Sequence, residues 1–192
     1  VMKKKLLGYS LNVESGQSVM REITELLDSG SRNCDWLACF NPHSYAVAKN
    51  DADFERSLLS ASWLVPDGSD ILLAGRILGL QVTERVTGFD IFDGVMQYLN
   101  KRAGSVFFLG STDETLALIA HKLPEDYPNV KLAGTYSPPF RSKYNRVELA
   151  EMVEAINLAK PDVLWVGMTA PKQEKWIAEV GPALDVGFAG AI

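Results

Sequence analysis

The sequence predicts an α/β protein with a mostly parallel, twisted sheet and helices on both faces, a Rossmann-like three-layer sandwich. Two observations support this fold. Short apolar runs alternate with segments of helical periodicity along almost the whole chain, a rhythm typical of βαβ units. Polar or glycine-containing loops follow most of the apolar runs, as expected where parallel strands end at a ligand-binding edge.

The individual elements follow from this rhythm. The apolar runs predict strands at Lys5–Tyr9, Trp36–Phe40, Ser62–Val65, Val106–Leu109, Val130–Gly134, Asp162–Gly167 and Asp185–Ala189. The segments between them predict helices at Ser18–Asp28, Ser44–Asn50, Ala52–Ser60, Asp70–Leu78, Phe89–Lys101, Asp113–Leu123, Arg146–Ala159 and Lys172–Glu179. Gly79 and Gly104 fall where helix C-caps belong.

The last residues, Asp185–Ile192, have the pattern of a strand that runs into a glycine-rich turn. A helix would normally follow such a turn and cover the sheet. We therefore expect residues 1–192 to be a single domain that lacks a C-terminal segment.

The composition is that of an ordinary soluble globular protein, with 192 residues, 47% hydrophobic and 22% charged. The net charge of −5 disfavours a nucleic-acid partner, because phosphate contacts need clustered Lys and Arg. Cys34 and Cys39, with His43 and His121, lack the spacing of a structural zinc site, and free thiols suit a reducing cytoplasm. No apolar run approaches the ~20 residues that span a bilayer.

The most informative motif, Gly167–Glu174, follows the apolar run Asp162–Val166 and precedes a helical pattern. A strand therefore ends there, and a helix opens with Pro171 in its first turn. The free N–H groups and positive dipole end of such a helix suit an anion such as a diphosphate.

Asp67 lies in Pro66-Asp67-Gly68, directly after the predicted strand Ser62–Val65. On the tripeptide alone a β-turn is the favoured interpretation, because Pro, Asp and Gly are typical turn residues. The alternative is a carboxylate at a strand end, where a base could act on a substrate hydroxyl. Asn41 has a similar pair of interpretations, since it could cap the helix near Ser44 or direct its amide at a sugar hydroxyl.

Three further loops carry candidate ligand groups. Arg85 is a solvated or ion-paired arginine unless it points into the cleft, where it could clamp a diphosphate or carboxylate. Gly110 and Ser111 permit close backbone approach or a helix cap, although no GxGxxG or GxxxxGK[ST] motif is present. Thr135 and Tyr136 begin a Pro-rich loop, which is either a rigid connection or a wall that stacks on a base or sugar.

An ordered set of motifs resembles the WecG/TagA/CpsF family of bacterial glycosyltransferases over about residues 5 to 190. The set comprises Phe40-Asn41-Pro42, Val65-Pro66-Asp67-Gly68, Glu84-Arg85-Val86-Thr87-Gly88, Phe108-Leu109-Gly110, and Val166-Gly167 followed by Pro171-Lys172-Gln173-Glu174. The PDG, ERVTG and PKQE elements are specific in this order, whereas no single element suffices.

The resemblance implies an inverting, metal-independent hexosyltransferase that needs no cofactor. It would transfer N-acetylmannosamine or a related hexose from a UDP-sugar to a polyprenyl-diphosphate-linked sugar, for cell-wall or surface polysaccharides such as teichoic acid. The expected location is cytoplasmic and peripheral, at the inner face of the cell membrane, with membrane contact through the absent C-terminal segment. Self-association as a homo-oligomer is a further expectation.

The same resemblance makes Asp67 the expected general base. The expected substrate-binding residues are Cys39, Asn41, Arg85, Gly110, Ser111, Thr135, Tyr136, Gly167, Gln173 and Glu174. The family often has Thr at the position of Cys39, and a thiol is a weaker hydrogen-bond donor than a hydroxyl.

A second class stays open: a nucleotide-binding α/β domain without catalytic activity of its own. The absent C-terminal segment favours it for this chain, while PDG and PKQE favour the enzyme. Binding of UDP is expected in both cases, so only turnover with a lipid-linked acceptor separates them. A dehydrogenase is disfavoured, because no glycine fingerprint follows an early strand.

Overall fold

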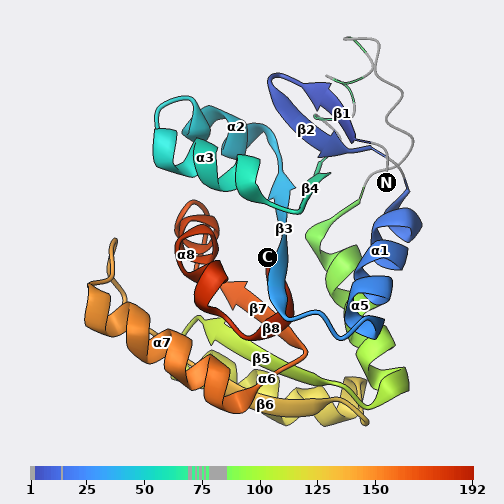
Figure 1. The fold of residues 1–192 in the computed structure, drawn as a ribbon, viewed down its shortest axis with the longest axis vertical. Helices are drawn as coiled ribbons and strands as arrows, with labels where there is room; N and C mark the ends of the chain where they lie inside the picture. The colour runs from blue at the N-terminus through green and yellow to red at the C-terminus, as the bar shows by residue number, and fades with distance from the viewer. Residues whose placement is uncertain are drawn as a thin grey trace.

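The computed structural model describes residues 3–13, 15–68, 71, 73, 75, 77 and 86–192. The predicted helix Asp70–Leu78 falls mostly outside these residues, and Gly79 and Arg85 fall wholly outside them. Figure 1 shows the course of the chain.

The centre of the fold is a six-stranded parallel sheet in the order β4-β3-β8-β7-β5-β6. Its strands are β3 (Asn33–Phe40), β4 (Trp63–Pro66), β5 (Ser105–Gly110), β6 (Lys131–Tyr136), β7 (Val163–Gly167) and β8 (Val186–Ala191). Most of these segments are short, apolar and buried on both faces, as strands inside a helix-covered parallel sheet must be.

Helices cover both faces of the sheet (Figure 1). One face carries α1 (Gly16–Asp28), α5 (Gly88–Arg102) and α6 (Asp113–Asp126); the other carries α2 (Pro42–Ala48), α3 (Ala52–Ser60), α7 (Arg146–Ala159) and α8 (Lys172–Val180), followed by the 3₁₀ turn η1 (Gly181–Ala183). Alternate strand residues supply the two cores, because Leu164 and Val166 pack on the α8 side and Val163 and Trp165 on the α5 side. The predicted three-layer α/β sandwich is therefore confirmed.

The predicted strand Lys5–Tyr9 is wrong. These residues span an antiparallel hairpin, in which β1 (Lys3–Leu6) pairs with β2 (Tyr9–Asn12). The chain reverses at Leu7 and Gly8, whose φ angles of 53° and 93° are the left-handed values of a two-residue hairpin turn. The usual sequence signal for such a turn is Asn-Gly or Asp-Gly, which this chain lacks here.

Two glycine predictions also need correction. Gly190 lies within β8 rather than in a turn. A Cβ at Gly190 would come within 2.0 Å of the Trp165 ring, so the glycine serves close packing inside the sheet. Gly104 follows the C-cap of α5 instead of forming it, since the C-cap is Ala103 with a φ of 53°.

The strand register brings the carboxyl ends to one edge of the sheet. Phe40 of β3 lies beside Pro66 of β4, and Gly110 of β5 lies beside Gly167 of β7. β8 lies between these two pairs of strands. The loops that carry the predicted site residues therefore open at the same edge, where ligands bind in open α/β sheets.

Candidate active site

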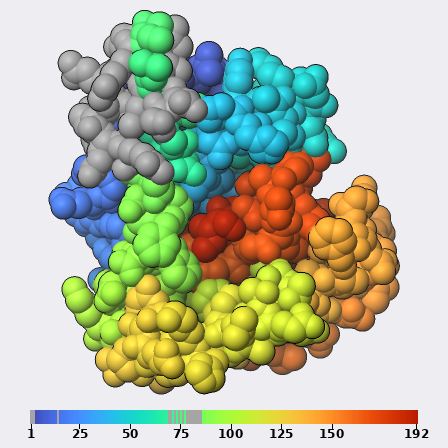
Figure 2. All heavy atoms as spheres, turned by 180° about the vertical axis from the view of Figure 1, so that it is seen from behind, coloured from blue at the N-terminus to red at the C-terminus, as the bar shows by residue number. Residues whose placement is uncertain are grey.

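A cavity of about 590 Å³, which we call the central cavity, opens where β3, β4 and β8 end and where α5 and α8 begin. The predicted residues that line it are Cys39, Asn41, Asp67, Gln173 and Glu174. Figure 2 views the molecule from this side and shows the dark red end of β8 in a hollow between α5 (green) and α8 (orange-red). The fold thus brings together side chains that lie far apart in the sequence.

Asp67 follows β4 directly and is half-buried at the wall of the central cavity. Its backbone N–H donates a hydrogen bond of 2.9 Å to the Phe40 carbonyl, and the following Gly68 has a φ of 103°. This bond extends the pairing of β4 with β3 by one residue, and the β-turn interpretation stays a prediction because residue 69 lies outside the described residues. The Asp67 side chain lines the cavity, so a carboxylate is present at the strand end.

Asn41 is the N-cap of α2. Its Oδ1 accepts a hydrogen bond of 2.9 Å from the Ser44 N–H, and Ser44 Oγ accepts one of 2.8 Å from the Asn41 N–H. This reciprocal pair is a capping box, so the helix-cap interpretation is confirmed. The cap uses only the amide oxygen of the side chain, so the amide nitrogen keeps its donor capacity on the cavity wall.

Gln173 and Glu174 lie in the first turn of α8 and are both buried. The Met168 N–H donates to Gln173 Oε1 at 3.1 Å, and Gln173 Nε2 donates to Glu174 Oε1 at 3.3 Å. Within the described part of the chain, Glu174 Oε2 has no hydrogen-bond partner. Burial raises the pKa of Glu174, because a charged carboxylate is poorly solvated there. The protonated form would place a buried O–H donor at the cavity wall.

Cys39 lies near the end of β3 and lines the same cavity. Burial raises the pKa of its thiol to about 12, and the charges of Asp67 and Glu174 add to the effect. The side chain is therefore a neutral thiol at neutral pH. It can pack against a ligand but is a weak hydrogen-bond donor.

Gly110, Ser111 and Gly167 lie on the other half of the sheet edge. A Cβ at Gly110, whose φ is 118°, would come within 2.2 Å of the Gly167 carbonyl oxygen, and that oxygen accepts a hydrogen bond of 3.1 Å from the Ser111 N–H. Ser111 and Gly167 line a cavity of about 460 Å³, which we call the polar cavity, together with Thr112, Ser137, Thr169 and Lys172. Gly110 is thus required by close backbone packing beside this cavity.

Thr135 and Tyr136 are the last residues of β6, not the start of a loop. The strand extends past its predicted end because both residues pair with β5. Neither lines the central or the polar cavity, whereas the next residue, Ser137, lines the polar cavity and donates a hydrogen bond of 2.9 Å to the Ser111 carbonyl. The predicted contact of Arg85 lies outside the described residues.

Some cavity residues were not predicted from the sequence. The central cavity is also lined by His43, Thr87, Phe89, Phe92 and Ile192. Lys172 of the polar cavity lies 5.3 Å from the Phe140 ring centre and 5.4 Å from that of Tyr144, within range of cation–π attraction. Lys172 belongs to the PKQE motif, so its place in the sequence was the signal that could have predicted it as a site residue.

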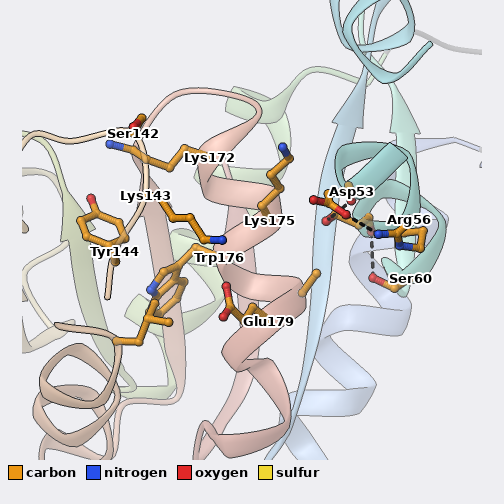
Figure 3. Close-up of a pocket in the computed structure, with 13 residues that line it drawn as sticks. Asp53, Arg56, Ser60, Ser142, Lys143, Tyr144, Lys172, Lys175, Trp176 and Glu179 are labelled. Carbon is orange, nitrogen blue, oxygen red and sulfur yellow. Dashed lines mark hydrogen bonds and ion pairs between the residues drawn. The ribbon is translucent and has the colours of Figure 1, made fainter. Parts of the chain in front are cut away.

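A separate cavity of about 500 Å³ lies between α3, α8 and the loop before α7 (Figure 3). None of the predicted site residues lines it. Two of its cations already have partners, because Arg56 pairs with Asp53 and Lys175 pairs with Asp51. We therefore place the candidate active site in the central and polar cavities.

The described residues contain no group of three or more His, Cys, Asp or Glu side chains that could hold a metal ion. None of their helices combines the length and apolar character needed to cross a membrane.

A parallel α/β sheet with polar and acidic side chains gathered at its carboxyl edge is typical of α/β proteins that bind a ligand at that edge. The chain belongs to the glycosyl transferase WecG/TagA/CpsF family, whose profile matches residues 4–192. A relative from Staphylococcus aureus (strain NCTC 8325 / PS 47), N-acetylglucosaminyldiphosphoundecaprenol N-acetyl-beta-D-mannosaminyltransferase, is 27% identical over 98% of this chain and 76% of its own length. The protein of that name from strain MRSA252 is similar to the same extent.

Proposed function

We propose that this glycosyltransferase moves N-acetylmannosamine, or a related hexose, from a UDP-sugar to a polyprenyl-diphosphate-linked sugar, with inversion and without a metal ion. The observation that carries the proposal is the carboxylate of Asp67 at the end of β4, in the wall of a cavity that Gln173 and Glu174 of the PKQE motif also line. The names of the Staphylococcus relatives support the acceptor and the sugar, because they specify an N-acetylglucosaminyl-diphosphoundecaprenol and an N-acetylmannosaminyl group.

In the proposed reaction Asp67 takes the proton from an acceptor hydroxyl. The hydroxyl oxygen forms a bond to the anomeric carbon of the donor sugar, and the bond from that carbon to the UDP oxygen breaks. Attack from the face opposite UDP inverts the anomeric centre. The acceptor sugar occupies the central cavity beside Asn41 and Gln173.

The polar cavity is the proposed site of UDP. Its wall includes the loop before α8, at the positive end of the α8 dipole, and the ammonium group of Lys172. These groups offset the charge that develops on the leaving diphosphate. We further propose that the enzyme works in the cytoplasm, peripherally at the inner membrane face, which co-sedimentation with anionic liposomes would test.

The test is turnover of UDP-N-acetylmannosamine with a short-chain polyprenyl-diphosphate N-acetylglucosamine. Asp67→Asn should lower kcat by ~10²-fold or more while leaving UDP affinity, measured by titration calorimetry, unchanged. Glu154→Gln, an exposed carboxylate on α7, is the charge-matched control and should keep wild-type kcat. Near-normal turnover by Asp67→Asn would remove Asp67 from the role of base.

The alternative is a nucleotide-binding α/β domain without catalysis. It predicts UDP binding with no transfer to any lipid-linked acceptor. A wild-type protein that binds UDP in the calorimeter but gives no product with a panel of UDP-sugars would favour this alternative.

A further inference from the structure

An apolar groove runs between α5 and α6, next to the central cavity. It has a volume of about 560 Å³, within the range of roughly 300–1,000 Å³ typical of small-ligand sites. Each helix contributes one stripe of side chains to it, with Phe89 and Phe92 on α5 and Leu118 and Ile119 on α6, above Phe108 of β5. We call this space the α5–α6 groove.

The walls of the α5–α6 groove expose large apolar side chains. Phe89 is 71% exposed and Leu118 is 70% exposed. Contiguous apolar surface of this kind is costly in water and usually marks a place where an apolar ligand or partner binds.

The groove adjoins the central cavity. Phe89 and Phe92 line both spaces, and their stacked rings lie 6.4 Å apart. Phe92 also packs on Trp165, with ring centres 5.1 Å apart, so the apolar wall continues into the core. A ligand whose sugar lies beside Asp67 can therefore extend an apolar chain directly into the groove.

The charged side chains of the groove already have partners inside it. Tyr127 Oη donates a hydrogen bond of 2.8 Å to Asp93, and Lys122 forms an ion pair with Asp126 at 3.9 Å. They leave no cluster of positive charge for a diphosphate. The groove thus suits a hydrocarbon chain rather than the charged part of a lipid-linked substrate.

We propose that the α5–α6 groove binds the first isoprenoid units of the lipid acceptor, the part nearest the diphosphate. This inference rests on the proposed function, in which the acceptor sugar lies beside Asp67. The acceptor in the names of the Staphylococcus relatives is a sugar diphosphate of undecaprenol, which is a chain of this apolar type.

The test compares two acceptors that carry the same sugar diphosphate, one as a methyl ester and one as a farnesyl ester. The wild type should have a KM at least tenfold lower for the farnesyl ester. Leu118→Glu should raise that KM at least fivefold and leave the KM and kcat for the methyl ester unchanged. Leu158→Glu, at a 77% exposed leucine on α7 of the opposite face, is the matched control and should change neither.

Several outcomes would overturn the inference. Equal KM values of the wild type for both esters, or no selective effect of Leu118→Glu in a folded variant, would exclude a role for the groove in chain binding. A change in oligomeric state caused by Leu118→Glu, seen by sedimentation without a change in the farnesyl KM, would assign the groove to a second copy of the chain.

A binding measurement separates this inference from the proposed function. Farnesyl diphosphate should change the tryptophan fluorescence of the protein, because Trp165 packs on Phe92, and Leu118→Glu should weaken that binding at least fivefold. One outcome is that the wild type binds farnesyl diphosphate and Leu118→Glu binds it more weakly, while no acceptor is turned over. In that case the proposed function fails and the groove assignment holds. If turnover is normal and farnesyl diphosphate does not bind, the groove assignment fails.

Discussion

Replacing Glu174 with glutamine should make the protein more stable at neutral pH. Glu174 is 3% exposed, and burial raises its pKa above the ordinary value of 4.5. At a pH between the ordinary pKa and the raised pKa, the folded protein keeps a proton on Glu174 that the unfolded chain has released. The free energy of unfolding therefore falls as the pH rises through this window, and the loss is complete above the raised pKa.

The size of the effect follows from the contacts of the carboxyl group. Oε1 accepts one hydrogen bond from Gln173 at 3.3 Å, and Oε2 has no partner within the described residues. Glutamine keeps a polar atom at the position of Oε2 but carries no charge, so only the cost of ionising the buried carboxyl is removed. Each unit of raised pKa costs ~1.4 kcal/mol once the group ionises, and Glu174→Gln should gain this amount per unit at pH 8 and almost nothing at pH 4. For a protein of this size each kcal/mol raises Tm by ~2–4 °C.

Urea unfolding followed by circular dichroism from pH 4 to pH 9 measures this difference. Glu179→Gln removes an exposed carboxylate from the same helix and controls for net charge. The stability curves of the wild type and Glu174→Gln should separate as the pH rises, while Glu179→Gln follows the wild type. Parallel curves for Glu174→Gln and the wild type would refute the reasoning, since Glu174 would then keep an ordinary pKa.

Three further outcomes are expected. Gly190→Ala should cost ~2–3 kcal/mol of unfolding free energy, because the new Cβ would come within 2.0 Å of the Trp165 ring; Gly181→Ala, with its nearest neighbour at 3.8 Å, should be nearly neutral in the same assay. Cys34 and Cys39 should resist iodoacetamide at pH 8 in the native protein and react after unfolding in urea, because burial raises both thiol pKa values to about 12; fast native modification seen by mass spectrometry would contradict this. EDTA should leave transfer unchanged, and an activity lost to EDTA and restored by Mg²⁺ would show that a metal is needed.

The sequence predicted the layers of the fold and part of the site for a common physical reason. Apolar periodicity distinguishes strands from helices, and parallel strands place their carboxyl ends at one edge. Asn41, Asp67 and Gln173 each follow or adjoin such an end, so their gathering in one cavity could be foreseen.

Most of the features that were missed depend on contacts between distant parts of the chain. The hairpin turn at Leu7 and Gly8 is local, but it has Leu where the usual Asn-Gly or Asp-Gly pair has its polar residue. Gly190 looks like a turn residue until the ring of Trp165 is placed against it. Phe89 has the spacing of an ordinary amphipathic helix, and only the position of α6 turns that face into the wall of a groove.

The position of β8 has a consequence for folding during synthesis on the ribosome. β3 ends at residue 40, and its partner β8 begins at residue 186. At ~5–20 residues per second, translation of the stretch between them takes on the order of ten seconds. Throughout that time the apolar edge of β3 lacks its final neighbour, and an open strand edge is a template for pairing with other chains. Substitutions along this edge of β3 should therefore reduce the yield of soluble protein more strongly than they reduce the free energy of unfolding of the folded protein.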